Sequence, residues 1–546
     1  MNESPEKPSG VRILRWILLI VGAIALFFAG SKFIFHFRPF IPQKGFYVGC
    51  NLIAIGFLIW MLMPILRRLV ALERWFFRWF LTWRILRRVL ISVGVLALLL
   101  PLFYAEENWR GRRAWENCKR ELETKGVVLD WNKFIPPPVP DDQNFFKASK
   151  MGVWFVRSQS GLTNELTRRL DNVVDTMANN LNEAFAVKYL AWSDQFAPDF
   201  DLVREALKRP YARMDGDYSK PHEQPIPNFV TVRSVAQTLA QRAKCELLLG
   251  QPDKALQDLT LLHDMCRLLE AAPTGKPMTL VSAMINVAVT GLYVYTLANG
   301  LESHAWKESQ LVVLQKQLAE VNLAPFMIGA FACEPAGSVS WLEHYKPSEL
   351  FNLSAIVTRS NRPETLWDKI RSLKGRWWDF VPHGWICQNI VHYRKISDDI
   401  HASLFNGTGL VTPKKADRAA LMLEEKLDQP GLFDSLAAIA IPNFSKALQI
   451  FAFNQTKANE AQIVCALELH RLANGNYPDS LDALVPKFIA KLPHDIIGGQ
   501  PLHYHRAPDG KFLLYSVGWN ETDDNGSPGT LADVKNGDWV WQYPLQ

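Results

Sequence analysis

The sequence lacks every local motif that would identify a reaction. It contains no GxSxG, HExxH or P-loop pattern and no glycine pattern of the dinucleotide-binding type. The seven cysteines include no CxxC pair or other metal-ligand spacing, so a zinc site of paired cysteines is not expected. A binding or scaffolding protein is therefore favoured over an enzyme. The alternative is an enzyme whose site is assembled from distant residues of the region 150–430.

The cysteines also give no sign of a disulfide framework. They are scattered along the chain, and free cysteines usually behave as small buried hydrophobes. A single disulfide, such as one between Cys245 and Cys266, stays open for a chain outside the cytoplasm. Isolated thiols are the favoured interpretation for all seven positions, which are Cys50, Cys118, Cys245, Cys266, Cys333, Cys387 and Cys465.

A general excess of basic charge is missing as well, although the formal net charge is +6. Between Leu66 and Arg88, seven arginines stand against a single acid, Glu73, and this segment accounts for the whole excess. No basic stripe with interleaved aromatic residues occurs elsewhere in the sequence. Nucleic acid is therefore not an expected partner.

Long apolar runs are present, and they are concentrated in the first hundred residues. The runs are Trp16 to Phe35, Phe46 to Leu66 and Ile85 to Tyr104. A membrane-spanning helix needs about 20 mostly apolar residues. We therefore predict three transmembrane helices within residues 16–105, preceded by a cytoplasmic N-terminus of residues 1–15. Three runs in succession argue against a cleaved signal peptide.

Basic residues set the expected orientation. Arginine-rich loops stay on the cytoplasmic side, so the connection 66–88 and the N-terminus are predicted to face the cytoplasm. Three crossings then place everything after about residue 105 outside. The connection repeats basic and aromatic residues at helical spacing, which is typical of an amphipathic helix lying on anionic lipid. A specific lipid or protein contact is the sharper alternative for the same candidate membrane-surface residues, which are Arg67, Arg74, Arg78, Trp75, Trp79 and Trp83.

The middle of the chain is predicted to be helical. A membrane-proximal helix and a stiff proline-rich segment, either a linker or a surface wrap, occupy 106–149. Residues 150–430 are expected to form a helical bundle or irregular αα-hairpins, most clearly where "LGQPD" separates two amphipathic helices. The apolar run 279–301 is expected to be a buried helix, while a fourth membrane span stays open.

The last hundred residues resemble a known family. "AAIAIPNF", "NGNYPDSLDALVP", "PLHYHR", "LLYSVG" and "DDNG" follow one another in the order found in type IV pilins and in the major pseudopilins of type II secretion. The resemblance covers about 436–541 and implies a small α+β domain, 431–546, in which a long helix packs on a short antiparallel sheet. The preceding "DQPGLFDS" differs from the leader and "FTLIEL" of pilin precursors, so pilin-type processing is not expected.

The resemblance also implies a metal. In major pseudopilins the loop after the "LYSxG" strand commonly binds calcium, and the matching positions here are Asp523 and Asp524, with Asn520 where an aspartate is often found. Carboxylates, amides and backbone carbonyls on a flexible loop suit Ca²⁺. A metal-free acidic turn is the alternative. A zinc site is a less favoured interpretation than ordinary strand and turn residues for three nearby histidines, His494, His503 and His505.

The predicted fold is mainly α, with three N-terminal transmembrane helices, a helical ectodomain and a small C-terminal α+β domain. The whole arrangement resembles a group of bacterial membrane-anchored proteins that join a "PPPVPDxxNF" segment, a helical region and a pseudopilin-like tail. We therefore expect a non-catalytic scaffold or accessory protein of an envelope or secretion-type assembly in the bacterial inner membrane. Its expected partners are the lipid bilayer and other envelope proteins. An unprocessed minor pseudopilin-like component is a further alternative.

Overall fold

The chain forms two compact units, Met1–Leu102 and Phe103–Gln546. The computed structural model describes residues 62–65, 67–75, 83–157, 163–170, 182–221, 223–269, 279–344, 381–404, 409–428, 433, 444–529 and 534–541.

In the first unit the described residues are helical and mostly exposed. Residues 62–65 and 67–75 are helical, and helix α3 (Trp83–Thr124) begins in this unit. From Leu86 onwards α3 contains an 18-residue apolar stretch of which 0% is buried. A helix with fully exposed apolar side chains is stable in an apolar environment such as lipid. The third predicted membrane run lies in this helix, which supports a membrane location.

Two helices of the described chain, not three, are long and apolar enough to cross a membrane. They are α3 and α10 (Leu280–Glu302). The predicted runs Trp16–Phe35 and Phe46–Leu66 lie outside the described residues, apart from Leu62–Ile65. In contrast to α3, 61% of the apolar stretch of α10 is buried inside the protein. This burial favours the interpretation of 279–301 as a core helix.

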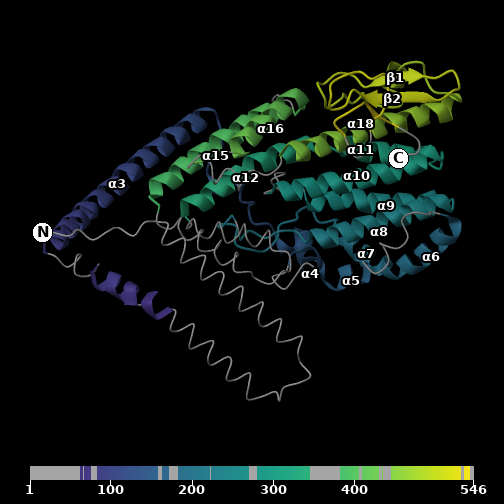
Figure 1. Ribbon diagram of the computed structural model, residues 1–546. Helices are drawn as coiled ribbons and strands as arrows, with labels where there is room; N and C mark the ends of the chain where they lie inside the picture. Colours follow the sequence, from purple (N-terminus) through teal and green to yellow (C-terminus); the bar gives the residue numbers. More distant parts are fainter. Residues whose placement is uncertain are drawn as a thin grey trace, which may run out of the picture. The chain divides into compact units, whose positions relative to one another are not determined.

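The second unit is a stack of helices with a small sheet on one side (Figure 1). Helices α8 (Phe229–Leu248) and α9 (Pro252–Met265) form the predicted αα-hairpin. The Asn228 side chain accepts a hydrogen bond from the first turn of α8, and Gly250 makes the connecting turn at a φ of +69°. Pro252 then begins α9, where its missing N–H removes no helical hydrogen bond.

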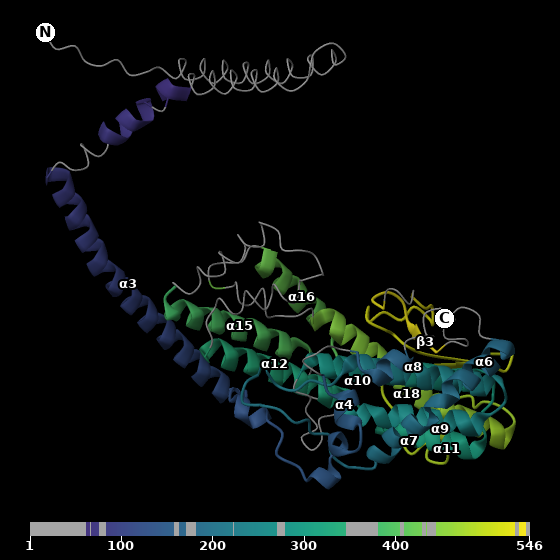
Figure 2. The same cartoon turned by 90° about the horizontal axis from the view of Figure 1, so that it is seen from below.

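Helix α10 lies at the centre of this stack, because it packs against α8 and α9 and against two helices from later in the chain, α12 and α18. Further helices of the unit are α4 (Met151–Phe155), α5 (Glu165–Leu170), α6 (Glu183–Ser193), α7 (Ala197–Ala206), α11 (Glu308–Glu320), α12 (Ala324–His344), α15 (His383–Leu404), α16 (Pro413–Asp428) and α18 (Phe444–Asn474). Figure 2 shows α12 and α15 running side by side.

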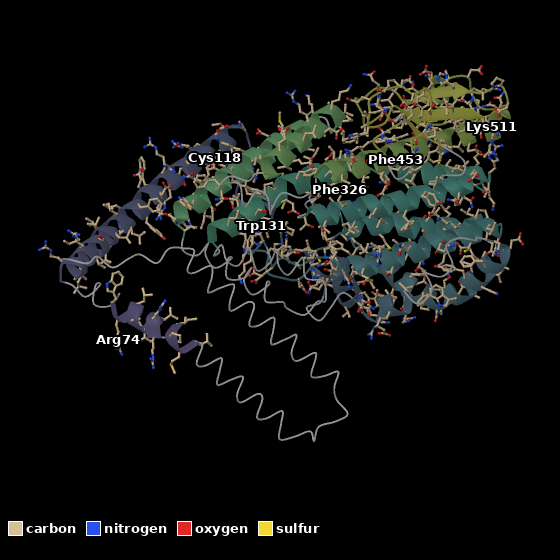
Figure 3. The ribbon with its side chains drawn as sticks, viewed as in Figure 1. Arg74, Cys118, Trp131, Phe326, Phe453 and Lys511 are labelled. Carbon is tan, nitrogen blue, oxygen red and sulfur yellow. The ribbon has the colours of Figure 1, made fainter. Side chains whose placement is uncertain are left out.

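The predicted C-terminal hairpin is confirmed. A three-stranded antiparallel sheet, in the order β1-β2-β3, consists of β1 (His503–Arg506), β2 (Phe512–Ser516) and β3 (Trp539–Val540). The turn between β1 and β2 contains Gly510 at a φ of +82°. The sheet packs on α18, where the ring of Phe453, which Figure 3 labels, lies 5.5 Å from that of Trp539.

Two glycines allow α3 and α15 to touch. A Cβ added at Gly111 would lie 2.0 Å from the carbonyl oxygen of Gly384, and one added at Gly384 would lie 1.9 Å from that of Glu107. No larger residue fits there without moving a backbone. Beside this crossing, the Asn108 side chain accepts a hydrogen bond from the Gly384 amide at 2.8 Å, and Trp385 Nε1 donates to Glu107 Oε2 at 2.9 Å. The C-terminal half of α3 is thus fixed to α15.

The proline-rich segment is a surface wrap. Its phenylalanines, Phe145 and Phe146, are buried in the helical core. Asn144 Nδ2 donates to the carbonyl oxygen of Arg213 at 2.7 Å, and the Arg213 amide donates back to Asn144 Oδ1 at 3.1 Å. A segment held by buried aromatic rings and paired backbone groups has little freedom to act as a hinge.

The C-terminal tail shares its hydrophobic cores with the helical region. One core combines side chains of α8 to α11 with Leu467 of α18 and Leu514 of β2. The other combines side chains of α12 and α15 with Phe451 of α18 and with Ile496. The predicted division at residue 430 therefore does not coincide with a boundary between these cores.

No disulfide joins Cys245 to Cys266. The six described cysteines are all free and buried. Cys245 lies in a small cluster with Ala186 and Tyr189, whereas Cys266 belongs to the large helical core. These thiols fill apolar space, as the favoured interpretation of the sequence expected.

We expect Leu467→Ala to destabilise the protein. Leu467 is 0% exposed on α18, in the core to which α10 and α11 also contribute, and such truncations cost about 2–5 kcal/mol. The matched control is Leu472→Ala, since Leu472 lies on the same helix but is 47% exposed; it should cost less than about 0.5 kcal/mol. Urea unfolding of the full chain in detergent measures both. Equal transition midpoints would contradict the packing of α18.

Candidate functional site in the C-terminal loop

The acidic loop follows directly from strand β2. This strand ends at Ser516, whose Oγ accepts a hydrogen bond from the Gly518 amide at 3.1 Å. Gly518 has a φ of +68°, and a Cβ there would lie 2.6 Å from the carbonyl oxygen of Gly537. A larger residue would clash with this backbone. The close approach brings the loop back against the residues that precede β3.

The three predicted calcium ligands lie in this loop and are held by internal hydrogen bonds. Asp523 Oδ1 accepts from the Tyr515 hydroxyl at 3.0 Å and from the Asn525 amide at 2.9 Å. Asn520 Nδ2 donates to Asp524 Oδ2 at 3.0 Å. The hydrogen bond from the Asn525 amide lowers the pKa of Asp523, so this carboxylate stays charged at neutral pH.

A further carboxylate, Asp538, organises the loop and was not predicted from the sequence. Its Oδ1 accepts from the Asp524 amide at 3.2 Å, and its Oδ2 accepts from the Gly526 amide at 2.7 Å. Asp538 is 2% exposed, and burial raises its pKa. The only sequence signal is an acid placed directly before the apolar run "WVW". The amides that it binds lie 14 and 12 residues away, so no local pattern reveals the contact.

The loop as it stands is a hydrogen-bonded acidic turn. In the part of the chain that the structure describes, no group of three or more His, Cys, Asp or Glu side chains is placed to hold a metal ion. Asn520 turns its amide nitrogen, not its oxygen, towards Asp524, and both oxygens of Asp538 accept backbone hydrogen bonds. Calcium needs six to eight oxygen ligands. The residues fit calcium only after Asn520 rotates and backbone carbonyls contribute.

The three histidines of the zinc alternative have other contacts. The ring of His503 stacks on that of Tyr515 at 4.8 Å, and its Nδ1 lies 3.5 Å from Asp523 Oδ2. His505 lies 6.4 Å from the same tyrosine ring. His494 Nδ1 faces a backbone carbonyl at 3.1 Å. These contacts are those of ordinary strand and turn residues.

A second polar cluster, which was not predicted from the sequence, lies between α18 and the sheet. Lys457 Nζ of α18 donates to Glu460 Oε2 at 2.8 Å and to the carbonyl oxygen of Val540 in β3 at 2.7 Å. Burial raises the pKa of Glu460 to about 7 and that of Asp495 to about 6. The cluster joins α18 to the sheet, and it contains groups that titrate near neutral pH.

The helical region contains a partly buried ion network in which one arginine lies among three carboxylates. Arg242 Nε donates to Asp258 at 2.8 Å, Nη1 donates to Asp194 at 2.9 Å, and Nη2 lies 3.6 Å from Glu246. Burial raises the pKa of Glu246 to about 8. Every guanidinium nitrogen thus has a carboxylate neighbour, and the network joins α8, α9 and the end of α6. We assign it a structural role.

The structure describes part of the predicted membrane-surface set. Arg67 and Arg74 are seven residues apart in one helical segment, a spacing that places them on one face. Trp83 is the first residue of α3, while Arg78 and Trp79 lie outside the described residues. Three members of the set are helical and exposed (Figure 3 labels one of them), namely Arg67, Arg74 and Trp75.

We expect the free energy of unfolding to fall as pH rises from about 5 to about 8. A carboxyl group whose pKa is raised in the folded state stabilises the fold fully below its ordinary pKa. This contribution is lost as pH rises through the raised value, which is about 7 for Glu460. The fall should be roughly 1–3 kcal/mol.

Glu460→Gln keeps a neutral side chain and should flatten this pH dependence. The flattening should be partial, because Glu246 and Asp495 keep their raised pKa values. Urea unfolding of the wild type and the variant at several pH values measures the two slopes. An unchanged slope in the variant would show that Glu460 does not titrate in this window.

No protein-family model matches the chain, and no curated protein and no solved structure matches it either. The resemblance of residues 436–541 to pseudopilins therefore rests on the ordered sequence motifs.

Proposed function

We propose that the protein is a membrane-anchored extracytoplasmic scaffold or accessory component of a bacterial envelope or secretion-type assembly, and that it acts by binding. Helix α3 carries this proposal. Its first part is apolar and exposed, and the same helix later buries Trp115, Cys118 and Leu122 in a core of the second unit. The helix is continuous from the apolar stretch to these buried residues. Such a connection suits a protein that presents a surface to partners.

The contacts of the tail motifs support its pseudopilin-like interpretation. Gly475 ends α18 at a φ of +80°, which allows the chain to turn. The hydroxyl of Tyr477 in the "YP" motif then donates to Glu468 of α18. The hydroxyl of Tyr504 on β1 donates to the carbonyl oxygen of Pro478 at 2.7 Å. The motif residues therefore lock the helix, the turn and the sheet together, and this accounts for their order in the sequence.

The polar clusters of the described chain also favour binding over catalysis. Arg242 is surrounded by carboxylates, Lys457 is paired with Glu460, and Asp538 binds two backbone amides. Charged groups held by internal partners stabilise the fold, whereas a catalytic acid or base must reach a substrate. The two carboxyl oxygens of these clusters that have no hydrogen-bond partner, Glu246 Oε2 and Glu460 Oε1, are buried. We therefore propose that the protein acts by binding and that these clusters stabilise its fold.

Cysteine labelling tests the proposed orientation. We expect an impermeant maleimide to label Lys208→Cys and Lys511→Cys in intact spheroplasts, because both positions follow α3 and their side chains are 69% and 83% exposed. Arg68→Cys, in the connection predicted to be cytoplasmic, should stay unlabelled until the membrane is opened. The wild type gives the background, which should be low because the six described native cysteines are buried.

The two lysine positions distinguish the alternatives for α10. Lys208 precedes this helix and Lys511 follows it, so a membrane-spanning α10 would leave only one of them accessible. If intact spheroplasts label Arg68→Cys but neither Lys208→Cys nor Lys511→Cys, the orientation of the protein is the reverse of the proposed one. Labelling of Lys208→Cys and Lys511→Cys together supports a core helix.

The proposed binding role is tested by cross-linking in membranes, followed by capture of the full chain and mass spectrometry. We expect a small set of envelope proteins to be recovered in proportion to the protein, and to be lost from a strain that lacks it. The purified chain should show no turnover in a broad hydrolase screen. Turnover that disappears on a single substitution would overturn the binding role and favour an enzyme.

We further propose that the acidic loop binds Ca²⁺ through Asp523 and Asp524, with Asn520 as an amide ligand. Calcium should raise the melting temperature of the full chain, because a ligand that binds only the folded state stabilises it. Asp523→Ala should abolish the calcium-dependent rise. Glu424→Ala, at an exposed acid on α16, is the matched control and should retain it.

The calcium test compares the rise, not the starting temperature, since Asp523→Ala also removes the hydrogen bond to Tyr515. Magnesium at equal concentration controls for general charge screening, because it demands a tighter octahedral site. If calcium leaves the melting temperature of the wild type unchanged, the loop is a metal-free acidic turn.

A further inference from the structure

A cavity of about 130 Å³ opens between α12 and two earlier segments of the chain. Glu334, Gly337 and Trp341 line it from α12, at the spacing of one helical face. Trp131 and Gln224 line it from the other side, and Figure 3 shows Trp131 next to α12. The volume is close to the ~150 Å³ of an engineered cavity that admits benzene. A small organic molecule therefore fits.

Its aromatic walls are held in place. Trp131 Nε1 donates to the carbonyl oxygen of Tyr218 at 2.7 Å, and this hydrogen bond fixes the indole. A Cβ added at Gly337 would lie 3.0 Å from Cζ3 of the same ring. The helix approaches the indole this closely because residue 337 has no side chain. Two tryptophans in one small cavity provide the electron-rich faces that attract cations.

Two hydrogen-bond acceptors, the Glu334 carboxylate and the Gln224 side-chain oxygen, line the cavity together with the Ser338 hydroxyl and the Trp341 indole. Glu334 Oε1 accepts one hydrogen bond, from the Leu280 amide at 2.9 Å, and the carboxylate forms no salt bridge within the described residues. Burial raises its pKa. The side-chain oxygen of Gln224 is buried and has no hydrogen-bond partner in the same part of the chain. A buried carboxylate beside an unpaired carbonyl oxygen is costly until a positive group or a donor reaches it.

We propose that this cavity is a binding site for a small organic ammonium ion. The charge of the ligand pairs with Glu334, its alkyl part contacts Trp131 and Trp341, and any N–H group that it carries donates to Gln224. An anionic ligand would be repelled by the carboxylate, and a neutral apolar one would leave the carboxylate without a counter-charge and the Gln224 oxygen without a donor. The proposal is independent of the function of the acidic loop, because the two sites share no residue.

Calorimetric titration of the full chain in a maltoside detergent tests the site. The probes are choline and ethanolamine, and the control is 3,3-dimethylbutan-1-ol, a neutral molecule with the shape of choline. We expect each cation to bind at least ten times more tightly than the neutral control. The glycerophosphodiesters of choline and ethanolamine form a second arm, because tighter binding of these would identify a lipid head group as the source of the ammonium ion.

Two substitutions assign the binding to this cavity. Glu334→Gln keeps the acceptor for the Leu280 amide but removes the charge, so it should weaken cation binding at least tenfold and leave the neutral control unchanged. Trp341→Leu keeps an apolar wall and should weaken cation binding several-fold. Glu308→Gln removes an exposed charge elsewhere, at the start of α11, and should have no effect.

The unliganded melting temperature of each variant shows that it is folded. Equal binding of choline and its neutral analogue would overturn the proposal and leave an apolar cavity. Absence of binding by either cation to the folded wild type would overturn it as well. Unchanged cation affinity in folded Glu334→Gln would place the binding at another site and would also overturn it.

Discussion

Buried polar side chains fix the position of α18 between the sheet and the helices α10 and α11. Glu468, 3% exposed, accepts a hydrogen bond from the Tyr477 hydroxyl and lies 3.0 Å from His304 Nδ1, just after α10. More than three turns earlier along α18, Gln455 Oε1 accepts a hydrogen bond at 2.8 Å from the amide of Leu323, the residue just before α12. Apolar contacts alone permit a helix to slide or rotate, but a buried acceptor that loses its donor costs about 1–3 kcal/mol. The pairs therefore select one register.

The sheet and its acidic loop take their position from that register. Lys457 of α18 reaches the carbonyl oxygen of Val540 in β3, and Phe453 packs on Trp539. From the loop itself, Trp519 Nε1 donates to Asp417 of α16 at 2.9 Å. The sheet is thus tied to α18, and the loop is tied to α16. A partner or cation bound at the loop would stabilise the contacts of the tail with the helical region, and not the hairpin alone.

Turn residues in the sequence predicted the two hairpins, because the formation of a hairpin turn depends on residues that are close together in the chain. The αα-hairpin follows from Gly250 and Pro252 at the turn, and the β-hairpin from "APDG" between two β-rich runs. Apolar content did not separate α3 from α10, since both are long and apolar and only the surrounding packing differs. The hydrogen bonds of Asp538 and the cavity beside Trp131 are formed by residues that are distant in the sequence, so no periodicity or motif predicts them. Contacts between side chains that are far apart in the sequence cannot be predicted from a single sequence by local patterns.

The contacts at the C-terminal end of α3 explain how a helix that begins with an exposed apolar stretch can be part of a folded domain. Gly111 and Gly384 bring the backbones of α3 and α15 together, and a rotation of α3 about its axis would break the hydrogen bond between Asn108 and the Gly384 amide. Helix α15 packs on α12, whose Glu334 holds the first residue of α10. The two backbones cannot shift far relative to each other at this crossing, because close-packed interiors deform little. Helix α3 therefore ends in the same layer of helices that lines the Glu334 cavity, and a cation that pairs with Glu334 would stabilise that layer.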